Sequence, residues 1–185
     1  GTTTGFSDLD RDGVVDLLIG GTEPAVAIVQ GPITAAMSLS GGWTGPAVAA
    51  LAAVDVTGDG WVDLLLSAPT DGSVWLLEGP VSAAGDVRTT GRRLRLPAAP
   101  SDKQGPISTG SDLDGDGDPD VVVGWTGSAL HPILAPGVRV FLDDGAGVAD
   151  ARAVHDQPAT RAGAAVLAPG DLNADGYDDL LVGGP

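Results

Sequence analysis

The 185-residue chain contains no cysteine, so no disulfide contributes to its stability. Basic residues are also scarce: nine Lys and Arg stand against 25 Asp and Glu, which gives a formal net charge of −16. Nucleic-acid binding requires basic patches, and an acidic surface is repelled by anionic membranes, so we expect neither partner. The longest apolar run, Ala47–Val54, is far shorter than the roughly 18 residues of a membrane span. The sequence therefore predicts no membrane insertion, and it contains no recognisable signal peptide.

What the chain has in abundance is one kind of acidic turn. The nine-residue pattern Asp-x-Asp/Asn/Thr-x-Asp-Gly-x-x-Asp begins at residues 8, 55, 112 and 171, and each copy leads directly into an apolar, strand-like segment. Sixteen of the 25 acidic residues lie in these four segments. Positions 1, 3, 5 and 9 carry oxygen-bearing side chains, and this alternate spacing lets a tight loop turn them toward one centre. Position 6 is always Gly, which tolerates the positive φ that such a loop needs.

A loop of this kind suits calcium, which takes six to eight oxygen ligands. Two carboxylates about 4 Å apart repel by roughly 4 kcal/mol at an effective dielectric constant of 20, and a hard divalent cation reverses that repulsion. Magnesium fits less well because it requires strict octahedral geometry, and zinc and copper fit less well still because Cys is absent and both His lie outside the loops. We therefore predict about four calcium ions. The predicted ligands, which include the backbone carbonyl at position 7, are Asp8, Asp10, Asp12, Val14, Asp16, Asp55, Thr57, Asp59, Trp61, Asp63, Asp112, Asp114, Asp116, Asp118, Asp120, Asp171, Asn173, Asp175, Tyr177 and Asp179.

Two other interpretations of the acidic segments were weighed. Asp and Gly are common turn residues, so a single copy could be an ordinary polar turn, but four copies that all keep the ninth-position Asp favour a metal loop. An EF-hand loop requires Glu at position 12 and flanking helices. Position 12 here is apolar in every copy (Ile19, Leu66, Val123 and Val182), so we expect strands after the loops. The second copy is predicted to be the weakest site, because Thr57 supplies a neutral oxygen.

The segments recur at intervals of 47, 57 and 59 residues, a period typical of propeller blades. We predict one domain, residues 1–185, with repeats of approximately 1–44, 45–103, 104–160 and 161–185. Each repeat reads as strand, loop, strand, turn, strand and a short fourth strand, of which RRLRL (92–96) is the clearest candidate. The Ala-rich segment Ala47–Val54 has helical propensity, but Pro46 and its place in the repeat favour a strand. The chain is therefore expected to be all-β.

Three stretches resemble the FG-GAP repeats of the integrin α-subunit β-propeller and its bacterial relatives: DLNADGYDDLLVGGP (171–185), DVTGDGWVDLLLSAP (55–69) and DLDRDGVVDLLIGG (8–21). The resemblance covers nearly the whole chain, although the Phe-Gly half of the pattern is poorly kept. It implies four-stranded propeller blades with structural calcium in the loop between the first two strands, and partners bound mostly on the opposite face and the rim. Integrin propellers have seven blades, whereas this chain holds three full repeats and the first half of a fourth. We therefore predict completion by further chain, by a second copy or by a head-to-tail neighbour.

No catalytic constellation is recognised in the sequence. The GxSxG elbow is absent, and His131 and His155 are interpreted as surface or turn residues, so we expect a protein that is not an enzyme. The predicted function is an extracellular, secreted, cell-surface or periplasmic calcium-binding propeller that serves protein interaction or adhesion. One alternative is a structural subunit of a surface assembly or filament. Another is the non-catalytic module of a secreted enzyme, with glycan binding by Trp43 and Trp125 as exposed aromatic rings, although ordinary packing is the favoured interpretation of these two residues.

Overall fold

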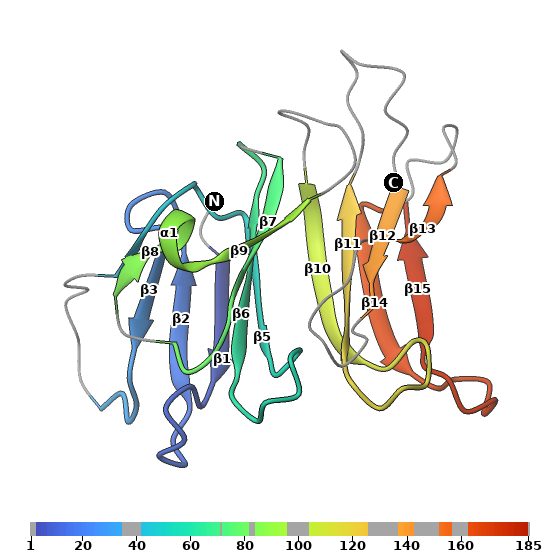
Figure 1. The fold of residues 1–185 in the computed structure, drawn as a ribbon, viewed down its shortest axis with the longest axis horizontal. Coiled ribbons are helices and arrows are strands. Elements are labelled where there is room, and N and C mark those ends of the chain that lie inside the picture. The colour runs from blue at the N-terminus through green and yellow to red at the C-terminus, as the bar shows by residue number, and fades with distance from the viewer. Residues whose placement is uncertain are drawn as a thin grey trace.

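The computed structural model describes residues 3–34, 42–70, 72–81, 84–95, 104–125, 137–142, 152–156 and 163–184. These residues form four sheets that stand side by side in chain order, with every strand pair antiparallel except β4 (Trp43–Thr44) with β8 (Gly85–Asp86) (Figure 1). The prediction of an all-β chain, with three full blades and the first half of a fourth, is confirmed.

Each sheet is built from the strands of one repeat, except that β8 of the second repeat joins the first sheet. The first contains β1 (Thr3–Ser7), β2 (Asp16–Gly20), β3 (Val26–Val29) and β4 (Trp43–Thr44), extended by β8 (Gly85–Asp86). The second contains β5 (Ala50–Val54), β6 (Asp63–Ala68), β7 (Ser73–Leu77) and β9 (Arg92–Arg95). The third contains β10 (Gln104–Ser111), β11 (Asp120–Trp125), β12 (Gly137–Phe141) and β13 (Arg152–Asp156), and the fourth contains β14 (Ala165–Gly170) and β15 (Asp179–Gly183).

The register of the first two strands of each sheet is the same in all four cases. The ninth-position Asp begins the second strand and pairs with the residue just before the first-position Asp. These pairs are Ser7↔Asp16, Val54↔Asp63, Ser111↔Asp120 and Gly170↔Asp179. Every acidic segment is therefore the connecting loop of a β-hairpin, as expected, and the loops lead into strands rather than helices.

The core lies between the sheets. The first strands of neighbouring sheets contact one another in the series β1, β5, β10 and β14. Three apolar clusters follow, one between each pair of adjacent sheets. Because the second sheet is covered on both sides, every residue of β6 and β7 is buried, which explains why these strands are apolar without alternation.

One local feature differs from the sequence-based expectations. The Ala-rich segment does form a strand, β5, but a single helical turn, α1 (Val87–Thr90), occurs where none was expected. It is capped by Asp86, whose carboxylate accepts a hydrogen bond of 2.8 Å from the Arg88 N–H. One turn is too short to show a helical period, which is why the sequence pattern did not reveal it.

Trp43 packs in the core, which is the favoured of its two interpretations, and it does not expose its ring for glycan binding. Trp43 is only 3 % exposed because its strand, β4, lies between β3 and β8 and its side chain packs in the first core cluster. β8 comes from the second repeat and pairs in parallel with β4, so it covers the outer edge of the first blade.

The two ends of the row of blades present apolar side chains to solvent. On the first blade Phe6 is 68 % exposed, and on the half-blade Leu167 and Leu181, which pair across β14 and β15, are 55 % and 50 % exposed. Between the blades the equivalent faces are buried. No helix among the described residues has the length and apolarity required to cross a membrane.

Candidate metal centres

The four acidic loops lie at one end of the molecule, at the lower edge of Figure 1. They connect β1 to β2, β5 to β6, β10 to β11, and β14 to β15. Because all four hairpins have the same register and the blades stand side by side, the loops form a row. The sequence-predicted ligand residues therefore gather in four separate groups on one face.

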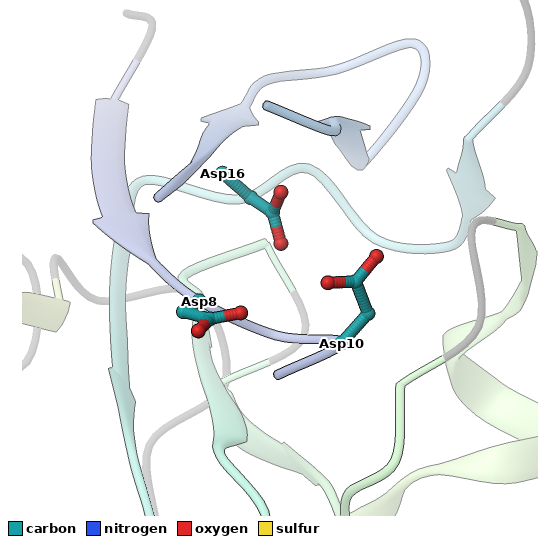
Figure 2. Close-up of side chains that lie close together, drawn as sticks. All are labelled: Asp8, Asp10 and Asp16. Atoms are coloured by element: carbon teal, nitrogen blue, oxygen red, sulfur yellow. The ribbon is translucent and has the colours of Figure 1, made fainter. Parts of the chain in front are cut away.

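Loops one and three each bring three carboxylates together. In loop one an oxygen from each of Asp8, Asp10 and Asp16 lies within 4.8 Å of the others. Figure 2 shows these three carboxylates turned toward a common space between the start of β2 and the loop that follows β1. In loop three the corresponding group is Asp112, Asp114 and Asp116. Asp12 and Asp120 are not members of these groups.

The backbone of each loop is folded around its first-position carboxylate. Asp8 accepts hydrogen bonds from the N–H groups of Asp12 (3.1 Å) and Gly13 (2.9 Å). Asp55, Asp112 and Asp171 accept the same bond from the sixth-position Gly. These amide contacts lower the pKa of Asp171, with the Gly176 N–H as the largest cause. An Asp at this position thus shapes the loop, and in loop four the lowered pKa of Asp171 favours the ionised state that a cation requires.

The fifth and sixth positions repeat an equally regular geometry. The fifth-position carboxylate accepts a hydrogen bond from the seventh-position N–H in all four loops. The sixth-position Gly has a φ of 85° to 99°, a conformation that L side chains rarely adopt. These bonds orient the backbone at Val14, Trp61, Asp118 and Tyr177. The role of their carbonyls as metal ligands remains a prediction.

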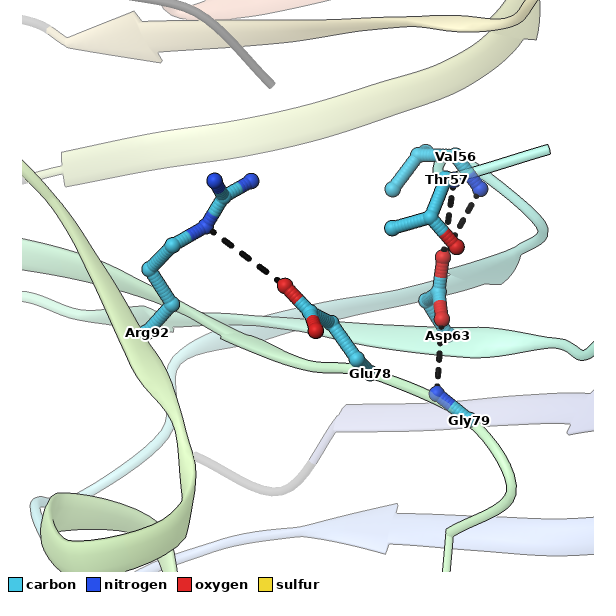
Figure 3. Close-up of polar contacts among 6 residues, drawn as sticks. All are labelled: Val56, Thr57, Asp63, Glu78, Gly79 and Arg92. Carbon is cyan, nitrogen blue, oxygen red and sulfur yellow. Dashed lines mark hydrogen bonds and ion pairs between the residues drawn. The ribbon is translucent and has the colours of Figure 1, made fainter. Parts of the chain in front are cut away.

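The ninth-position Asp connects its loop to a more distant turn. In loop two, Asp63 accepts hydrogen bonds from the N–H groups of Val56, Thr57 and Gly79 (Figure 3). Asp16 makes the equivalent contacts with Leu9 and Gly31 in loop one. Burial raises the pKa of Asp63, and the amide hydrogen bonds act against that rise. The ninth position therefore holds the hairpin together in addition to any role at a metal.

Loop two contains buried oxygens without partners. Oδ1 of Asp55 and Oγ1 of Thr57 are both buried and accept or donate no hydrogen bond of acceptable geometry. The Thr57 hydroxyl does lie beside the Asp63 carboxyl (Figure 3), and this proximity opposes the rise in the Asp63 pKa. An unpaired buried oxygen is costly unless something satisfies it. A hard cation that prefers oxygen ligands would satisfy these two oxygens, and the oxygen donors of loop two fit such a cation.

Two contacts at the loops had no signal in the sequence. Gln30, twenty residues away from Asp10 in the chain, donates a hydrogen bond of 2.8 Å from Nε2 to Oδ2 of Asp10. Arg11 places its guanidinium carbon 4.3 Å from the ring centroid of Trp61 in the next loop. Both contacts arise from the way β3 and the second blade pack against loop one, so the nine-residue pattern alone could not indicate them.

The two Trp residues considered as a glycan site do not form one among the described residues, and one of the two His residues is placed in a strand. Trp125 is partly buried, and the guanidinium of Arg139 lies 4.8 Å from its ring centroid. With Trp43 buried, the expected pair of exposed rings is not formed. His155 belongs to β13, and His131 lies outside the described residues.

Comparison with known protein families gives two matches. A family model described as an FG-GAP repeat matches residues 47–77, which contain loop two and its flanking strands. A model described as an FG-GAP-like repeat matches residues 112–182, which contain loops three and four. Comparison with curated proteins finds no match.

Proposed function

Because the chain belongs to the FG-GAP repeat family, we propose that it is a calcium-stabilised β-propeller module that binds other proteins outside the cell. The observation that carries the calcium part is the convergence of three carboxylates within 4.8 Å of one another in loops one and three. Uncompensated, such groups repel, so a cation is needed to make the cluster favourable.

The donor atoms favour calcium over other metals. All side-chain ligands offered by the loops are oxygens, and the buried, unpartnered Asp55 Oδ1 adds an oxygen that needs a positive partner. Hard oxygen donors in a flexible loop suit calcium better than magnesium or zinc. Asp8, Asp10 and Asp16 would hold the ion in loop one. The bound cation would supply charge neutralisation and a cross-link between the loop and the start of the second strand.

A binding role is favoured over catalysis. FG-GAP repeat domains are generally non-catalytic, and the loop carboxylates are engaged with backbone amides of their own blades, which is a structural arrangement. Members of the family typically occur in extracellular or cell-surface proteins. Millimolar calcium in those compartments suits sites whose dissociation constants are roughly 10⁻⁴ to 10⁻³ M, as in many extracellular modules.

The apolar faces exposed at the two ends of the row of blades support the proposal that further protein covers them. Phe6 on the first blade and Leu167 and Leu181 on the half-blade occupy faces that are buried wherever two blades meet. Exposed apolar faces of this kind mark interaction sites. We propose that another blade of the same type covers them, supplied by further chain or by a second copy. A structural subunit that polymerises head to tail is the second candidate, favoured by apolar faces at both ends.

Isothermal titration calorimetry with calcium chloride tests the calcium part of this proposal. We expect binding near millimolar concentration by the wild-type chain and a lower stoichiometry when Asp112→Asn and Asp114→Asn are combined. Asp86→Asn removes one negative charge outside the loops and should leave the stoichiometry unchanged. Absence of heat from the wild-type chain, or an equal effect of Asp86→Asn, would contradict the calcium assignment.

A further inference from the structure

Neighbouring metal loops touch each other through the same two positions. The fourth residue of one loop meets the seventh residue of the next: Arg11 meets Trp61, Gly58 meets Asp118, and Gly115 meets Tyr177. A Cβ built on Gly58 would lie 3.1 Å from Oδ1 of Asp118, and one built on Gly115 would lie 2.6 Å from Cε1 of Tyr177. This contact therefore repeats at each junction between the blades.

The backbone at the fourth position is also the same in all four loops. Its φ is positive throughout, with values of 61° for Arg11, 66° for Gly58, 83° for Gly115 and 62° for Ala174. Arg11 and Ala174 are the two non-Gly residues of positive φ among the described residues. A non-Gly residue in this conformation is uncommon and indicates that its surroundings determine it.

At the first junction the contact has specific chemistry. The Arg11 guanidinium carbon is 4.3 Å from the Trp61 ring centroid, a cation–π geometry. The same guanidinium lies against the backbone of loop two, because a Cβ on Gly60 would be 2.7 Å from its Nη2. Arg11 itself stands between Asp10 and Asp12 of loop one. It thus belongs to one loop and rests on the ring and backbone of the other.

From this geometry we infer that the Arg11–Trp61 contact couples metal binding in loop one to metal binding in loop two. The inference rests on the proposed calcium function. An ion in loop one fixes the residues on both sides of Arg11, and Arg11 in turn fixes Trp61. The backbone N–H of Trp61 donates a hydrogen bond to the carboxylate of Asp59 in loop two. Loop two then loses less conformational freedom when it binds its own ion. Arg11 is accordingly a positioning residue rather than a ligand.

Loop two is the loop whose ion affinity should depend most on this coupling. It offers three carboxylates, since Thr57 replaces the third-position Asp, and it contains the unpartnered Asp55 Oδ1. Electrostatics alone predicts the opposite effect of Arg11, because a positive charge beside the loop repels a cation. Replacement of Arg11 therefore separates the two explanations by the direction of the change: coupling predicts weaker binding in loop two, and simple repulsion predicts tighter binding.

Terbium titration of the full chain provides the test. Trp61 is the one Trp within the four loop segments, but Arg11 of loop one also lies on its ring, so terbium emission excited through Trp and lost in Trp61→Phe reports on loops one and two together. The component of that emission that is also lost when loop two is disabled by Asp55→Asn with Asp59→Asn reports on loop two. We expect loop two to weaken roughly five-fold or more when loop one is disabled by Asp10→Asn with Asp12→Asn. Arg11→Ala should cause a similar loss, and disabling loop one in that background should add nothing. Arg11→Lys should recover part of the affinity.

Several controls keep the outcomes separate. Ala174 occupies the same position with nearly the same φ as Arg11, so Ala fits the backbone, and Arg11 is exposed. Arg92→Ala removes an equal charge away from the loops and should leave the terbium midpoint unchanged. The coupling is overturned if Arg11→Ala tightens loop two, or if disabling loop one weakens it equally with and without Arg11. Failure of the wild-type chain to bind calcium or terbium at all would instead overturn the proposed function and the coupling with it.

Discussion

The carboxylate of Asp63 accepts a hydrogen bond of 2.7 Å from the backbone N–H of Gly79, sixteen residues further along the chain. Asp16 and Gly31 make the same contact in the first blade, at 3.0 Å. The ninth-position Asp therefore joins the acidic loop to the Gly-Pro turn that follows the third strand. This tie is made by protein groups alone, a side-chain carboxylate and a backbone N–H.

Replacement of Asp63 should destabilise the protein even in the presence of a chelator. Asp63→Ala leaves the N–H groups of Val56 and Gly79 without an acceptor, and we expect a loss of roughly 2–4 kcal/mol in the free energy of unfolding. Urea denaturation in EDTA measures it. Asp59→Ala is the matched control: Asp59 is exposed and bonds only within its loop, so its effect in EDTA should be under about 1 kcal/mol. Equal losses in the two variants would argue against the tie.

Calcium removal should lower the melting temperature. With ~1 mM calcium and a dissociation constant of ~0.1 mM, one site contributes about 1.4 kcal/mol, and four sites contribute roughly 5–6 kcal/mol. For a chain of this size that corresponds to a shift of about 10–20 °C. Differential scanning calorimetry with and without EDTA checks the value. Magnesium at the same concentration should restore little of it, and an unchanged melting temperature would count against structural calcium.

The Gly-Pro turns should not accept a larger residue at Gly79. A Cβ there would lie 2.5 Å from Cβ of Trp61 and 2.8 Å from the backbone oxygen of Val62, and neither atom can move without shifting loop two. We expect Gly79→Ala to cost roughly 1–3 kcal/mol by overpacking, as measured by denaturant midpoint. Glu78→Ala is the adjacent control, because its ion pair with Arg92 is solvent-exposed, with a long N–O distance of 3.7 Å.

The cap of α1 should contribute a pH-dependent part of the stability. The Arg88 N–H, followed by the Thr44 hydroxyl, lowers the pKa of Asp86 below its usual 3.8. Ionised Asp86 therefore stabilises the folded state above pH 3.8, and this contribution is lost as the pH falls through the lower, folded-state value. The stability difference between wild type and Asp86→Asn should be present at pH 6 and shrink below pH 3.8. A difference that does not vary with pH would exclude this origin.

The exposed blade faces should drive self-association of the isolated chain. Leu167→Ser combined with Leu181→Ser removes apolar side chains that are half exposed, so we expect weaker association in sedimentation equilibrium with little loss of folding stability. Ile33→Ser changes a residue of similar exposure, 48 %, in the segment after β3 and serves as the control. Association that is the same in all three proteins would indicate that these faces are not the contact.

The sequence was most informative where one short pattern specifies both the local turn and the pairing around it. The spacing of Asp55 to Asp63 determined a hairpin loop, and the apolar run after it predicted a strand buried on both faces, which β6 is. The sequence favoured packing of Trp43, but it did not indicate what covers this residue, because the covering strand β8 lies more than forty residues away. Arg11 was missed for the same reason: its partner lies in another repeat.

The pairing of β4 with β8 crosses a repeat boundary and so limits how this protein could be dissected. A fragment cut between the first and second repeats would leave Trp43 on an open edge without Gly85 beside it. Gene duplication or deletion of the first repeat alone would break the same junction. We expect the first two repeats to behave as one inseparable folding and evolutionary unit.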